Sequence, residues 1–281
     1  MQKSRMFALA IVLVLALMAL GTLAAQTRTK GTVAPAVALP EKALVDDLVA
    51  ANRVLAHEIH VLDAYGHISV RSAINPNRYY LSRAIAAGMV TATDIIEYDL
   101  DSNPVGGSKG DGYLERFIHG EIYKVRPDVM AVIHAHSTEM ITLAAAGVPL
   151  RNLIHTGSFI NDGVPVWDIR KFGGTADDML IRNPALGRSL AGALGNKTAL
   201  ILFGHGVAVT GSSLATTVSN SYFLNMNARI QIDAMRIGGG SVSYLEREPG
   251  AKAPAATPAG AGANNRAWEY WKRRVAAEVA R

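Results

Sequence analysis

Hydrophobic residues follow two alternating periods along most of this chain, and this alternation is what most limits the folds it can adopt. Apolar residues recur at helical spacing in residues 41–60, 184–194 and 214–239. In contrast, "RYYLSR" (78–83) alternates as a strand does, and "TALILF" (198–203) is a short apolar run typical of a buried strand. Helices and strands that alternate in this way predict one α/β domain with a central sheet covered by helices on both faces.

The N-terminus has the layout of a secretory signal peptide. Lys3 and Arg5 precede the apolar run "MFALAIVLVLALMALGTLAA", which ends in small residues, so cleavage is expected near Ala24 or Ala25. The apolar run is somewhat long for a signal peptide, and an uncleaved membrane anchor is therefore the alternative. We expect an exported protein, periplasmic or secreted, that contacts a membrane only if this segment stays attached.

Composition divides the chain further, because a Gly-, Pro- and Ala-rich stretch separates the α/β region from a last helical segment. The expected organisation is a signal peptide (1–25), a linker (26–40), the α/β domain (41–247), a flexible tether (248–265) and a C-terminal helix (266–281).

Cysteine is absent from all 281 residues. This absence excludes disulfides, thiolate metal ligands and a cysteine nucleophile, so any metal must be held by nitrogen and oxygen atoms. The formal net charge is +5, but no basic cluster is interleaved with aromatic residues. A nucleic acid is therefore not an expected partner.

Two histidines stand one residue apart in the segment "VMAVIHAHS" (129–137), which the apolar pattern predicts to be a strand. Residues two apart on a strand face the same side, so His134 and His136 are expected to project together. A third histidine, His205, lies between two glycines where the strand 198–203 ends. Three histidines around an open position are what a catalytic divalent metal requires.

Glu115 stands near the start of the helical segment "YLERFIHGEIYKV", directly before the strand that carries the two histidines. It could be a fourth ligand or the base that moves a proton. The plainer interpretation is that Glu115 only pairs with His119, one helical turn further on. His57, His60 and His155 have no companion pattern and are interpreted as structural.

Taken together, three segments resemble the class II aldolase/adducin family, which includes fuculose-phosphate and rhamnulose-phosphate aldolases and ribulose-phosphate epimerases. They are "GHISVR" (66–71), "ERFIHGEIYKVRPDVMAVIHAHS" (115–137) and "GHGVAVTGSSL" (204–214). The resemblance implies a three-layer α/β/α sandwich around a largely antiparallel sheet. It also implies a homotetramer with active sites at subunit interfaces.

By the same resemblance, His134, His136 and His205 match the metal ligands of the family, and Glu115 matches its ligand or catalytic acid/base. C-terminal segments of the family cap a neighbouring subunit's cleft. Trp268, Tyr270 and Trp271 would then either cap such a cleft or simply pack against their own chain.

The chain departs from the sugar-phosphate aldolases at the positions that bind phosphate in that family. These positions read His67, Ser82 with Arg83, and Tyr113 with Leu114. Tyrosine and leucine cannot replace two hydroxyl donors to a phosphate, so a sugar phosphate is not the expected substrate.

A substrate carboxylate is expected at these positions instead, because a fixed guanidinium offers it two parallel donors. The residues expected to bind substrate are Arg83, Ser82, His67, Ser69 and Arg71, although a structural role is an equal alternative for Arg71. This set looks most like the subgroup that includes 3-hydroxy-2-methylpyridine-4,5-dicarboxylate decarboxylase.

The sequence therefore predicts a divalent-metal-dependent carbon–carbon lyase that acts on a small, non-phosphorylated hydroxy or oxo carboxylic acid, by decarboxylation or retro-aldol cleavage. Zinc is the first choice of metal, and manganese, iron or cobalt also suit histidine and carboxylate ligands. Two alternatives are a non-haem iron oxygenase on the same fold and a non-catalytic adducin-like binding module. An epimerase is a weaker third, because it would again need a phosphate site.

Overall fold

The computed structural model describes residues 39–106, 111–172, 178–245 and 263–279. The predicted signal peptide, the linker up to residue 38 and the tether up to residue 262 lie outside the described residues. No helix in these described ranges is both long enough and apolar enough to cross a lipid bilayer.

Within the described residues, seven strands form a single sheet in the order β3-β2-β1-β4-β7-β6-β5. Every neighbouring pair is antiparallel except β5 and β6, which run parallel. The strands are β1 (His67–Arg71), β2 (Arg78–Ser82), β3 (Ile95–Asp99), β4 (Ala131–Ala135), β5 (Val166–Trp167), β6 (Ala199–Leu202) and β7 (Gly206–Gly211). The sheet is thus largely antiparallel, as the family resemblance implied.

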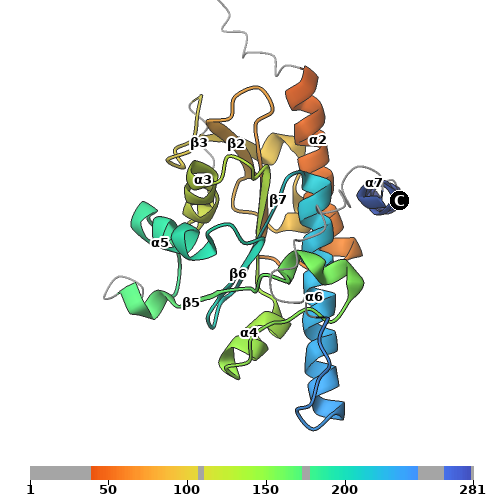
Figure 1. Cartoon of the computed structure of the whole chain (residues 1–281). Coiled ribbons are helices and arrows are strands. Elements are labelled where there is room, and N and C mark those ends of the chain that lie inside the picture. Colours follow the sequence, from red (N-terminus) through yellow and green to blue (C-terminus); the bar gives the residue numbers. More distant parts are fainter. Residues whose placement is uncertain (1–38, 107–110, 173–177, 246–262, 280–281) are drawn as a thin grey trace, which may run out of the picture. The chain divides into compact units, whose positions relative to one another are not determined.

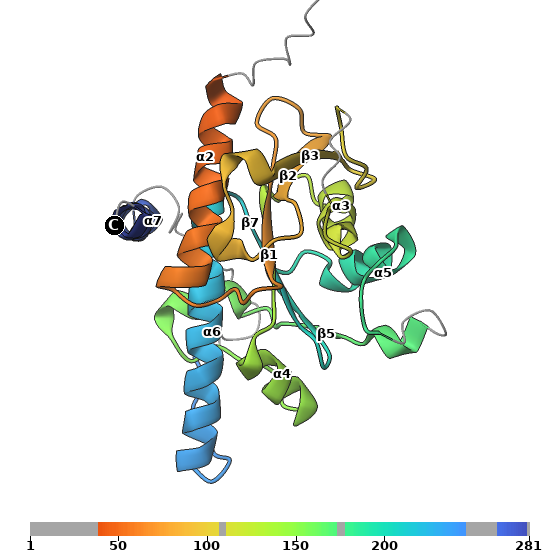
Figure 2. The same ribbon diagram turned by 180° about the vertical axis from the view of Figure 1, so that it is seen from behind.

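Helices cover both faces of this sheet (Figures 1 and 2). They are α2 (Leu39–Arg53), α3 (Arg116–Val125), α4 (Thr138–Ala145), α5 (Pro184–Leu194), α6 (Leu214–Ile237) and α7 (Ala263–Val279). Side chains of α2, α4, α6 and α7 join one buried apolar cluster, and those of α3 and α5 join a second cluster on the opposite face. Alternate residues of the strands supply both clusters, which confirms the predicted three-layer α/β sandwich.

Local sequence signals explain where several helices begin and end. The Asn183 side chain accepts a hydrogen bond from the Leu186 N–H and Pro184 follows it, so α5 begins where the sequence predicts. The first predicted helix differs, because α2 ends at Arg53 and the chain continues as a π-helical turn, Val54–Glu58. A pattern with a period of 3.6 residues does not distinguish these two helical forms.

Helix α7 packs against its own chain. Trp268 and Trp271 are buried in the same apolar cluster as α2 and α6, and the Trp271 ring lies 5.6 Å from that of Tyr222. Tyr270 is 56% exposed. Of the two roles expected for these aromatic residues, packing within the chain is the one that Trp268 and Trp271 adopt.

Candidate metal centre

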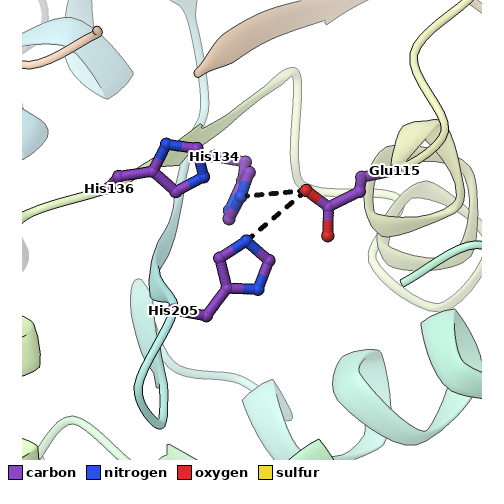
Figure 3. Close-up of side chains that lie close together, drawn as sticks. All are labelled: Glu115, His134, His136 and His205. Carbon is purple, nitrogen blue, oxygen red and sulfur yellow. Dashed lines mark ion pairs between the residues drawn. The ribbon is translucent and has the colours of Figure 1, made fainter. Parts of the chain in front are cut away.

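Glu115, His134, His136 and His205 converge at one end of the central strands (Figure 3). Each offers one ligand atom, and all four atoms lie within 4.8 Å of one another. His134 is in β4, which pairs with β1 on one side and β7 on the other. His136 lies one residue beyond the end of β4 and still points to the same place. The structure therefore brings together every residue that the sequence suggested as a metal ligand.

His205 reaches this place because the turn between β6 and β7 is tight. The His205 N–H donates to the Leu202 carbonyl, and Gly204 has a positive φ of 67°, which side chains disfavour. A side chain at Gly206 would collide with the carbonyl oxygen of Ala135. The two glycines thus allow the turn to fold over the end of β4 and place the third imidazole beside the other two.

The sequence pattern placed Glu115 at the start of a helix, and in the structure it lies immediately before α3. Its Oε2 atom is 3.4 Å from His134 Nε2 and 3.5 Å from His205 Nε2. Its Oε1 atom accepts a hydrogen bond from the Ile181 N–H at 3.0 Å. The carboxylate is therefore held in the cluster from the side of the chain that leads into α5, a contact that the sequence did not predict.

Burial and charge set the protonation states of these groups. Burial lowers the pKa of His134, so its ring is neutral and can act as a ligand. Burial alone would raise the pKa of Glu115, but the neighbouring His134 and His205 outweigh it and hold this pKa below its ordinary value. Glu115 is thus an anion, which is the form that binds a metal or accepts a proton.

The donor set fits a divalent cation. The Nδ1 atom of His134 has no hydrogen-bond partner among the described residues, and its Nε2 atom has only the Glu115 carboxylate at 3.4 Å, although the ring is fully buried. Unpaired buried nitrogens destabilise a protein, and a cation bound at one of them would offset that cost. Three imidazoles and one carboxylate are a ligand set that zinc, manganese, iron or cobalt accepts.

The structure adds a residue that sequence reasoning missed, Asp63. The Nδ1 atom of His136 lies 3.0 Å and 3.2 Å from the two carboxylate oxygens of Asp63, which leaves its Nε2 atom for a cation. Burial alone would raise the pKa of Asp63, but the N–H groups of Gly66 and Tyr65 and the His136 ring outweigh it and lower this pKa. Asp63 is 73 residues from His136 in the chain, so no short motif could have indicated the pair.

Asp63→Asn is expected to weaken zinc binding by about 10- to 100-fold, because a carboxylate that orients a ligating histidine and raises its basicity contributes this much to metal affinity. Competition with a chelator of known affinity would measure the effect. Asp101→Asn is the matched control, since Asp101 is an exposed partner of Lys124. Equal zinc affinity in Asp63→Asn and wild type would contradict an orienting role.

Among the expected substrate-binding residues, His67 lies nearest to the cluster. It is directly opposite His134 in the β1–β4 register, and the two rings are 5.2 Å apart. The Tyr113 ring lies 4.3 Å away on another side. His67 thus occupies a position from which it could meet a molecule bound at the cluster.

Arg83 lies beside the segment that leads to Glu115. Its Nε atom donates to Asp94 at 2.7 Å, and its side chain is 45% exposed. The following residues are tied to that segment, since the Tyr113 hydroxyl donates to the Ile85 carbonyl. Ser82 is fully buried beside this segment, and the contact of its hydroxyl with substrate stays a prediction.

Two expectations require correction. Arg71 is 4% exposed, and its guanidinium donates to four backbone carbonyls, those of Val129, Pro76, Tyr123 and Arg126. Ser69 is also buried, and its hydroxyl is hydrogen-bonded to His119 and Tyr123. Arg71 therefore has the structural role that was its alternative, and Ser69 bonds within the protein instead of to substrate.

Comparisons with known proteins show the family of this chain. The sequence profile of the Class II Aldolase and Adducin N-terminal domain matches residues 46–232. Decarboxylase tropJ from Talaromyces stipitatus is 35% identical over 211 residues, which are 71% of this chain and 79% of that protein. A 3,4-dihydroxyphthalate decarboxylase from Arthrobacter keyseri is 29% identical over 205 residues, 68% of this chain and 79% of that protein.

Solved structures show the same fold. An aldolase II superfamily protein from Pseudomonas syringae superposes with a TM-score of 0.68 at 22% sequence identity. The match covers 85% of this chain and 94% of that one.

Proposed function

Because the chain belongs to the class II aldolase and adducin family, we propose that it is a divalent-metal-dependent lyase that decarboxylates a small, non-phosphorylated hydroxy or oxo carboxylic acid. The observation that carries the proposal is the convergence of Glu115 with His134, His136 and His205. The similarity to decarboxylases supports a carbon–carbon lyase in general.

The residues around the cluster favour a carboxylic acid over a sugar phosphate. The Tyr113 hydroxyl is occupied by the Ile85 carbonyl, and Leu114 is an exposed apolar side chain. Neither can replace the hydroxyl donors that a phosphate needs. The Arg83 side chain is 45% exposed, and a guanidinium binds a carboxylate through two parallel hydrogen bonds. Retro-aldol cleavage of such an acid is the alternative within the same proposal.

A divalent cation held by the three histidines and Glu115 would supply a Lewis acid that stabilises negative charge as the carbon–carbon bond breaks. In decarboxylation that bond leaves its electron pair on the remaining carbon, CO₂ departs, and the carbon takes up a proton. Glu115 is anionic, so it would act as a ligand or a base before it could deliver this proton. Arg83 would orient the carboxylate, and zinc is the first choice of metal.

The test is a screen of zinc-loaded protein with hydroxylated aromatic dicarboxylates, including 3,4-dihydroxyphthalate, and with aliphatic hydroxy acids. We expect release of one CO₂ for each substrate consumed, without oxygen uptake; aldehyde release would identify retro-aldol cleavage. Oxygen consumption with ferrous iron would instead support an oxygenase. A protein that binds no metal and converts no acid would support a non-catalytic binding module.

We also propose that the protein is exported and that it assembles as a homotetramer with active sites at subunit interfaces. The basic and apolar pattern of residues 1–25 supports export, and the family resemblance supports the tetramer. Small carboxylic acids outside the cytoplasm would then be its substrates.

A further inference from the structure

Four polar side chains form a hydrogen-bonded chain between β1 and α3, directly beside the metal centre. The Tyr123 hydroxyl lies 2.8 Å from Ser69 Oγ, which lies 2.6 Å from His119 Nδ1. His119 Nε2 in turn lies 2.7 Å from His67 Nδ1. All four residues are buried. Apolar side chains would fill this space at lower cost in desolvation, so the polar chain calls for an explanation beyond packing.

The direction of these hydrogen bonds follows from the two hydroxyl groups. Among the described residues, Ser69 Oγ is the only acceptor within hydrogen-bond distance of the Tyr123 hydroxyl, so we assign the tyrosine proton to this bond. Ser69 then has its own proton left for His119 Nδ1. His119 must carry its proton on Nε2 and donate it to His67 Nδ1. A neutral His67 therefore carries its proton on Nε2.

His119 is neutral, as this assignment requires, because burial is the main cause that lowers its pKa to about 3. His67 Nδ1 accepts a hydrogen bond from His119, so this nitrogen carries no proton of its own. Burial raises the pKa of Tyr123, so its hydroxyl keeps its proton. Each of the four hydrogen-bonded side chains thus has one proton to donate. The direction of the first hydrogen bond therefore determines the direction of the next two.

We propose that Tyr123, Ser69 and His119 are positioning residues that fix His67 as a hydrogen-bond donor through Nε2 to an anionic oxygen of the substrate. His67 Nδ1 is committed to His119, so Nε2 is the only ring nitrogen left to meet a substrate. The opposite tautomer would present a lone pair, which repels a carboxylate. This inference rests on the proposed function, and it specifies the substrate as an acid with a carboxylate beside its metal-chelating oxygens.

The direct test is the tautomer of His67, measured by ¹⁵N NMR on zinc-loaded protein labelled at histidine. The His67 signals are assigned by their loss in His67→Gln. We expect the proton on Nε2 in wild type and a mixture of both tautomers in Ser69→Ala. Ser221→Ala is the matched control, because Ser221 is a buried serine whose hydroxyl donates to the Val218 carbonyl of its own helix, and it should leave His67 unchanged. A proton on Nδ1 in wild type would overturn the proposal.

The second test separates the substrate contact from the tautomer. Calorimetry compares 3,4-dihydroxybenzoate with catechol, which has the same adjacent oxygens but no carboxylate. We expect Ser69→Ala to weaken 3,4-dihydroxybenzoate binding by about two- to tenfold, because affinity falls with the fraction of His67 that still carries its proton on Nε2, and to leave catechol binding unchanged. Equal loss for both ligands, or no loss, would refute donation to the carboxylate.

Two outcomes keep the two proposals distinct. If neither ligand binds the zinc-loaded wild type and no acid of the screen is converted, the proposed lyase function fails, whereas the tautomer of His67 still decides the positioning role. If Ser69→Ala does not fold, Tyr123→Phe replaces it. That variant removes only the first donor of the chain and keeps the ring beneath Arg71, so we expect the same direction of change with a smaller size.

Discussion

The His134→Ala protein should bind zinc on the order of 10³-fold more weakly than wild type and should show no lyase activity above background. His134 is fully buried at the centre of the ligand cluster, between β1 and β7. Alanine removes one of four ligands, and no other described residue of the cluster can take its place. Metal analysis after dialysis against a chelator, together with CO₂ release from the best substrate of the screen, would measure both effects.

His155→Ala is the control for this experiment, because His155 is exposed and lies outside the cluster. It should retain the metal content and the activity of wild type. Circular dichroism must show that His134→Ala is folded, since the substitution also leaves a cavity. A folded His134→Ala protein with the metal content of wild type would rule out the metal centre described here.

Arg71→Met should lower the free energy of unfolding by about 3–5 kcal/mol. Methionine fills the space of the arginine stem but leaves four backbone carbonyls without their donor. These carbonyls belong to the turn after β1 and to the end of α3 with the turn that follows it, so the guanidinium links separate segments. Burial is the main cause that lowers the Arg71 pKa, which agrees with its place inside the protein. Chemical denaturation would measure the loss.

Arg229→Met provides the comparison, because Arg229 forms an exposed ion pair with Glu139. Surface pairs contribute about 0–1 kcal/mol, so this variant should unfold close to wild type. An Arg71→Met protein that is as stable as Arg229→Met but has a much higher KM would restore the substrate role first expected for Arg71. A loss of stability without a change in KM would establish the structural role.

The elements of this fold could be predicted where a short stretch carries its own signal. Strand β2 follows the alternation in "RYYLSR", and α5 begins at Asn183 because that side chain caps the helix. The π-helical turn after α2 and the start of α3 at Arg116 could not be predicted. Packing against the sheet decides where these two features lie, because the hydrophobic period of the sequence does not change at either position.

The candidate metal ligands could be predicted from the sequence because two of them lie one residue apart in one predicted strand and the third lies between two glycines. The residues that surround these ligands could not be predicted. Asp63 contacts His136, and Ile181 contacts Glu115, although each pair is far apart in the sequence. The sequence around Arg71 is the same whether its side chain binds a substrate or four backbone carbonyls. The type and spacing of residues in the sequence do not indicate such distant partners.

What the sequence determined by itself was the periodicity of the strands and helices and the type of donor atoms at the centre, because both depend on residues close together in the chain. Only the tertiary structure decided which groups orient those donors and which polar side chains are enclosed. These properties arise when β1, β4 and α3 meet, and the hydrogen bonds from Tyr123 to His67 exist only in that arrangement.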